Sequence, residues 1–128
     1  MQFADSALPV GGFSFSNTLE SAIEMGVVCD ESTLAEFTRE IVRQAVSTDG
    51  VAALNAFRAA KDGDYHSIIR CDKALNARKA NTEQRLMSQR MGRKLAELFA
   101  EITDNDLLRR FYGDITSART SGTYAVTQ

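Results

Sequence analysis

The side chains that most often carry out catalysis or bind metal are few and scattered in this chain of 128 residues. His66 is the only histidine, and neither Cys29 nor Cys71 lies near it in sequence. A histidine and cysteine metal site would therefore need long-range convergence, and a Ser-His or Cys-His nucleophilic pair would have to use the same His66. We predict a surface histidine, two free thiols, no metal or other cofactor, and no enzymatic activity.

The segment SALPVGGFSFSNTLE, residues 6–20, contains the only proline and a glycine pair. Gly11 and Gly12 lack the glycine spacing and the Lys-Ser/Thr pair of a phosphate-binding loop. Its large apolar side chains are Leu8, Val10, Phe13 and Phe15. This is more apolar surface than a short loop ordinarily hides, which is typical of a surface for a protein partner. The alternative is a glycine turn that lets the two phenylalanines pack nearby.

Two further features carry charge. Asn17-Thr18-Leu19-Glu20 fits a capping box, so Glu20 is either a helix cap or a carboxylate that also faces a partner. The basic residues of ARKANTEQRLMSQRMGRK are Arg78, Lys79, Arg85, Arg90, Arg93 and Lys94. No aromatic residues alternate with them, as base stacking would require, and their charges spread around a helix. This segment therefore indicates a solvated or protein-docking face and not a nucleic-acid site.

The elements that would position these residues are helices throughout. Apolar residues recur at helical spacing in stretches that end at Gly26, follow Asp30, run from Val51 to an end in Asp62-Gly63-Asp64, start near Thr82, and cover 106–112. Asp64 can cap a further stretch over 65–77. The expected core stripes are Leu34, Phe37, Ile41 and Ala45; Val51, Leu54 and Phe57; and Met87, Met91, Leu95, Leu98 and Ile102. Gly92, inside the longest helix, predicts a close approach by another backbone. Residues 117–128 read as a loop followed by one helical turn.

Composition sets the remaining bounds. Length predicts one domain over residues 1–128, with a loop over 1–16 and helices thereafter. Short connections predict an all-α, antiparallel helical bundle. The net charge of -2 offers no field for nucleic acid, and no segment reads as a membrane span or a signal peptide, so we expect a cytoplasmic protein.

Three segments resemble a known family. LPVGGFSFSNTLESAIEMGVV is similar to the N-terminal signature of the urease accessory protein UreF family, EQRLMSQRMGRKLAELF to its second hallmark, and TSGTYAVTQ to the start of a later helix. Asn17-Thr18 and Lys79-Ala80 depart from the residues that many members have there. Because the family continues with further helices, we expect this chain to be truncated at the C-terminus.

The resemblance implies a non-enzymatic chaperone for urease maturation. It would bridge the accessory protein UreD, also called UreH, and the GTPase UreG for nickel insertion into apo-urease, as a possible homodimer. The expected partner-binding residues are Leu8, Pro9, Gly11, Gly12, Phe13, Ser14, Phe15, Glu20, Arg85 and Gln89. The alternative is a regulator that acts directly on the GTPase cycle of UreG. Which surface meets which partner stays open.

Overall fold

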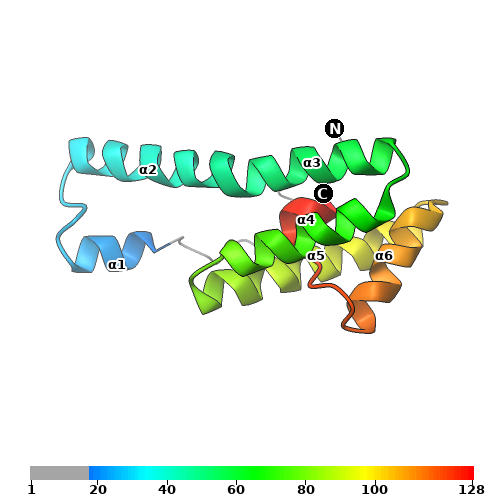
Figure 1. Ribbon diagram of the computed structural model, residues 1–128. Helices are drawn as coiled ribbons and strands as arrows, with labels where there is room; N and C mark the ends of the chain where they lie inside the picture. Colours follow the sequence, from blue (N-terminus) through cyan, green and yellow to red (C-terminus); the bar gives the residue numbers. More distant parts are fainter. Residues whose placement is uncertain (1–17) are drawn as a thin grey trace.

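A computed structural model describes residues 18–128, and every regular element in that range is helical. The predicted all-α class is confirmed. Figure 1 shows the elements in chain order. They are α1 (Leu19–Glu24), α2 (Glu31–Ala45), the π-helix η2 (Val46–Gly50), α3 (Val51–Lys61), α4 (Tyr65–Arg78), α5 (Thr82–Ile102), α6 (Asp106–Thr116) and α7 (Tyr124–Thr127).

Acidic side chains cap the starts of two helices. The Asp30 carboxylate accepts a 2.8 Å hydrogen bond from the amide of Thr33, whose hydroxyl oxygen accepts one from the amide of Asp30. Asp64 accepts a 3.0 Å bond from the amide of Ser67 and so starts α4. Gly26 adopts φ +70° just after α1, a backbone conformation that glycine reaches without a steric penalty. Short polar side chains therefore start these helices, and a glycine ends the first.

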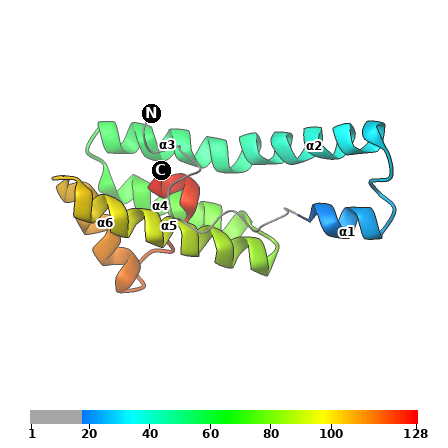
Figure 2. The ribbon, with the colours of Figure 1, turned by 180° about the vertical axis from the view of Figure 1, so that it is seen from behind.

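The expected antiparallel arrangement fails between residues 45 and 51. There the chain does not turn, and α2, η2 and α3 form one continuous rod (Figures 1 and 2). The hydroxyls of Ser47 and Thr48 donate to the carbonyl of Gln44 at 3.1 and 2.7 Å, which locally perturbs the backbone ladder without ending the helix. After this rod, the chain reverses beyond Lys61, where α4 runs back along α3.

The core lies where α3, α4, α5, α6 and α7 meet. Its buried cluster is Ala59, Ile68, Ala96, Phe111 and Ile115. By contrast, α2 buries none of its side chains, so the rod extends beyond the packed body. The predicted stripe of α2 is accordingly wrong as a core face: Leu34 is exposed, and Phe37 and Ile41 are only half-buried.

The predicted stripe of α3 is also wrong as a core face. Leu54 and Phe57 are 49% and 67% exposed, whereas Ala56 and Ala59 are buried. Because α3 packs on both α4 and α7, the small side chains allow close approach and the large ones face outward. On α5 the expectation holds for Leu95, which is fully buried, but it is wrong for Ile102, which is 58% exposed.

A buried carboxylate fixes the start of α7. Asp72 of α4 has no exposed surface, and its oxygens accept five hydrogen bonds from residues 120–123. Both the amide and the hydroxyl of Thr123 donate to Oδ1, at 2.7 and 2.6 Å. The predicted final helical turn is confirmed, and Asp72 holds it against α5. There the backbone of Gly122 meets Gly92, which is the close approach expected at that glycine.

Candidate protein-docking site

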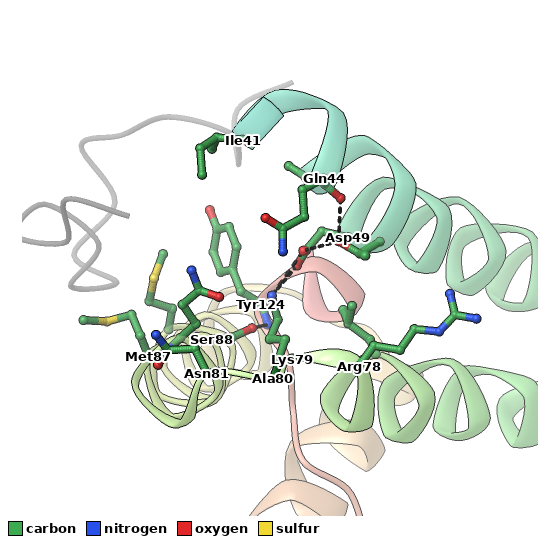
Figure 3. A pocket seen from close by; sticks show the side chains of 15 residues that line it. Ile41, Gln44, Asp49, Arg78, Lys79, Ala80, Asn81, Met87, Ser88 and Tyr124 are labelled. Carbon is green, nitrogen blue, oxygen red and sulfur yellow. Dashed lines mark hydrogen bonds and ion pairs between the residues drawn. The ribbon is translucent and has the colours of Figure 1, made fainter. Parts of the chain in front are cut away.

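An open pocket of about 480 Å³ lies between the rod and the α4–α5 hairpin. Figure 3 shows that its walls come from the end of α2 and η2 on one side and from the end of α4 and the first half of α5 on the other. Tyr124, the first residue of α7, closes the back. Asp72 therefore helps to position this part of the lining, because it fixes the segment that precedes Tyr124.

The apolar part of the pocket lining, here called the floor, comes from both walls and is adaptable. It is formed by Ile41, Ala45, Leu75, Met87 and Met91. The sequence predicted both methionines in the core, but they are half-buried and line the pocket. Methionine side chains are unbranched and polarizable, so they reshape around different apolar groups. Such a floor suits an apolar side chain of a protein partner.

An ion pair borders this floor. The Lys79 ammonium lies 2.9 and 3.1 Å from the two carboxylate oxygens of Asp49, and the hydroxyl oxygen of Thr48 lies 3.1 Å from the same carboxylate. Because the Lys79 side chain is only 16% exposed, this pair is better shielded from solvent than an ordinary surface ion pair. It fastens η2 to the end of α4 and so sets the width of the pocket.

Two of the predicted partner-binding residues lie beside the pocket. Arg85 donates from Nε and from a terminal nitrogen to the Lys79 carbonyl, at 3.1 and 2.6 Å. One turn later, Gln89 donates to the Asn76 side chain at 2.8 Å. Both side chains are half-buried and hold the α4–α5 connection in place. Their role as partner contacts stays a prediction.

The other predicted site residues do not join them. Glu20 is exposed on α1, which Figures 1 and 2 place beside the first turns of α2 and away from α4 and α5. The N-cap of α1 is Thr18 and not the predicted Asn17. The remaining predicted partner-binding residues all lie outside the described part of the chain. They are Leu8, Pro9, Gly11, Gly12, Phe13, Ser14 and Phe15.

The titratable groups form no arrangement suited to metal or nucleophilic chemistry within residues 18–128. His66 and Cys29 are exposed, Cys71 is half-buried, and both cysteines are free thiols, as predicted. No group of three or more histidine, cysteine or acidic residues in this range could hold a metal ion. Nor is any of the described helices both long and apolar enough to cross a membrane.

One phenol has a shifted pKa. Burial, together with a 2.8 Å hydrogen bond donated to Asp114, raises the pKa of Tyr65 above its ordinary value. The guanidinium of Arg110 stacks 3.8 Å from the centre of the same ring. These contacts join the start of α4 to α6 on a side of the molecule that does not line the pocket, so we read them as structural.

Little in the amino-acid pattern indicated the Asp49–Lys79 pair. Thr48, Asp49 and Gly50 are typical of a turn or a cap, and they suggest a break between two helices. The pair forms because the π-helix places Asp49 within hydrogen-bond distance of Lys79 at the end of α4. The available signal was Lys79, where the chain departs from the family pattern that the sequence resembles.

Comparison with known proteins points to one family. A sequence model described as UreF matches residues 28–128. Urease accessory protein UreF 2 of Brucella canis is 52% identical over 126 residues, which are 98% of this chain and 52% of the relative. Urease accessory protein UreF of Yersinia pseudotuberculosis is 48% identical over 128 residues, covering 100% of this chain and 56% of the relative. The chain spans about half the length of these relatives, and no solved structure matches it.

Proposed function

The chain belongs to the UreF family of urease accessory proteins, and we propose on that basis that it is a protein-binding scaffold in urease maturation. In this role it bridges UreD (UreH) and the GTPase UreG, and the assembly inserts nickel into apo-urease. The cytoplasm is the proposed compartment, because Cys29 and Cys71 are both free thiols, which suits a reducing environment.

One observation carries the proposal. The segment EQRLMSQRMGRKLAELF, by which the sequence resembles the family, supplies Met87 and Met91 to the floor of the pocket. A family segment that forms an adaptable apolar hollow, with a half-buried ion pair at its edge, has the make-up of a partner-binding surface. Protein recognition therefore accounts for this segment better than catalysis does.

The test is co-purification of this chain with UreD and UreG. Met87→Glu places a charge on the pocket floor and is expected to weaken retention by about tenfold or more, since a charge buried in an interface without a partner is strongly unfavourable. Leu86→Glu is the matched control, because Leu86 lies next to Met87 on α5 but is 46% exposed and does not line the pocket. Circular dichroism verifies that both variants fold. A folded Met87→Glu protein that binds normally would remove the pocket from the interface.

The N-terminal segment needs its own experiment. Phe13→Glu is expected to weaken co-purification much more than it changes the helical signal, because apolar residues in excess of what a helix cap needs suit an interface. Unfolding of this variant would instead make Phe13 a core residue. Normal folding with normal binding would exclude the segment as an interface.

The alternative of direct action on the UreG GTPase cycle is less well supported. An arginine that reaches into a partner's active site must have its guanidinium available, but Arg85 already donates twice to the Lys79 carbonyl. Measuring GTP turnover by UreG with Arg85→Ala and Glu20→Ala separates the two functions. Altered turnover with intact complex formation would favour regulation, whereas loss of binding alone would favour the scaffold.

A further inference from the structure

The rod formed by α2, η2 and α3 carries a series of exposed apolar side chains. They are Val42, Val46, Val51, Leu54 and Phe57, with exposed fractions of 55%, 64%, 48%, 49% and 67%. We call these five residues the rod stripe. Single exposed apolar residues are ordinary, but a contiguous row of large ones marks a surface that another element covers.

The π-helix is what makes this row contiguous. In an α-helix, positions three or four apart lie on one side, whereas Val46 and Val51 are five apart. In a π turn the hydrogen bonds run from residue i to i+5, so η2 adds one residue to the turn between them. Successive residues of the rod stripe are then separated by four positions, by one π turn, by three positions and again by three positions. Without η2, the two halves of the stripe would face different directions.

The charges beside the rod stripe are mainly of one sign. Arg39, Arg43, Arg58 and Lys61 lie three or four positions from a stripe residue, and all four are exposed. Arg43 is paired with Glu40 at 3.2 Å, whereas no carboxylate of the described chain pairs with the other three. Asp49 is equally near Val46, but its charge is matched by Lys79 at the pocket. The unpaired charge along the stripe is therefore positive.

This pattern selects the kind of occupant. A second copy of the same stripe would bring arginine and lysine against arginine and lysine, which disfavours self-association. A helix whose apolar face is bordered by carboxylates would instead satisfy both the stripe and its basic edge. The occupant that fits is an acidic amphipathic helix.

The lengths of the relatives indicate where such a helix comes from. This chain matches only 52% of the Brucella canis relative, and α2 buries no side chain of its own. The last helix, α7, packs against both α3 and η2, so residues that follow this point in a longer UreF protein start beside the rod (Figure 1). We propose that the rod stripe is the docking surface for an amphipathic helix with acidic borders from the half of the UreF polypeptide that this chain does not match.

The test joins this chain, after Gln128, to the sequence that follows the matched region in the Brucella canis relative. Backbone amide hydrogen exchange is then compared between the chain alone and the hybrid. The hybrid should slow exchange across residues 34–57 by about tenfold or more, because covering the rod stabilises it against local opening. Phe57→Glu should return the hybrid to the rate of the chain alone. The control Ala77→Glu, at an exposed position of α4, should not.

A second variant tests the charge argument. Arg58→Glu combined with Lys61→Glu should reduce protection in the hybrid much more than in the chain alone, where the only expected effect is a small loss of helix-end stabilisation. Equal exchange in hybrid and chain would overturn the proposal, as would a hybrid whose protection is indifferent to Phe57→Glu or to the charge reversal. Light scattering that finds a dimer of the chain alone, broken by Phe57→Glu, would assign the stripe to a second copy instead. None of these readouts involves urease, so their outcome is independent of the proposed maturation role.

Discussion

A Cβ atom added to Gly92 of α5 would overlap the carbonyl oxygen of Gly122. It would also lie 2.7 and 2.8 Å from backbone atoms of Thr123 and Tyr124. All three contacts are with backbone, which cannot rotate away as the end of a flexible side chain can. Two segments far apart in sequence therefore touch at a point that only glycine allows.

Gly92→Ala should destabilise the protein by about 3 kcal/mol or more, although alanine is favoured in an isolated helix by about 1 kcal/mol. Gly113→Ala is the matched control, because its added Cβ would meet nothing within 4 Å in α6. That change should be neutral or stabilising. Urea denaturation measures both. A Gly92→Ala protein as stable as the wild type would mean that α7 moves away from α5 at little cost.

Asp72→Asn should lower the free energy of unfolding by about 3 kcal/mol. Backbone N–H groups donate to both oxygens of Asp72, so the NH₂ group of asparagine would place its own hydrogens against those N–H groups. The carboxylate it replaces accepts all five of its hydrogen bonds within the protein. Asp62→Asn, at an exposed position, controls for the loss of charge. Denaturant midpoints that are equal for the two variants would contradict a structural role for this carboxylate.

Acid should remove the contribution of the α4 cap. Hydrogen bonds from the side chain and the amide of Ser67 hold the pKa of Asp64 below its ordinary value of 3.8. A carboxyl with a lowered folded-state pKa stabilises the protein above its ordinary pKa, and that stabilisation is lost as pH falls through the folded value. Thermal melts should therefore show Asp64→Ala less stable than wild type at neutral pH and the two converging below the folded pKa. A difference that persists at the lowest pH would show that the cap acts without its charge.

Phe57→Ser should change stability by less than about 0.5 kcal/mol, whereas Ala56→Leu should cost about 1–3 kcal/mol through overpacking. The reason is that Phe57 is 67% exposed and its neighbour Ala56 only 4%. Hydrophobicity alone predicts the opposite order. Thermal unfolding of the two variants, measured side by side, decides which face of α3 is inside.

The sequence predicted features that local chemistry controls. Asp30 and Asp64 start their helices because short acidic side chains accept from exposed amides, and that preference needs no tertiary contact. Gly92 was also readable, since glycine inside a long helix is costly unless something approaches closely. The all-α class follows from the same helical periodicity.

Features that depend on distant neighbours were not readable. The spacing of Leu54 and Phe57 shows that they share a helix face, but not whether the chain supplies a cover for that face. Residues 47–50 are of types that favour a turn, yet they form a π-helix. That conformation is accompanied by a hydroxyl contact of Thr48 and by the ion pair of Asp49 with Lys79, thirty residues later, which the local sequence does not indicate. The pocket followed from this junction. Met87 and Met91, which the helical periodicity predicts in the core, therefore line the pocket instead.

The contact between Asp72 and residues 120–123 also predicts an order of folding. The two partners are separated by about fifty positions, so the loop between them must close before any of these hydrogen bonds forms. A nascent chain emerging from the ribosome can complete α4 early, but Asp72 keeps its water shell until Thr123 is available. The α3–α4 hairpin, made of local contacts, can assemble first. Docking of α7 is then the late step that closes the core.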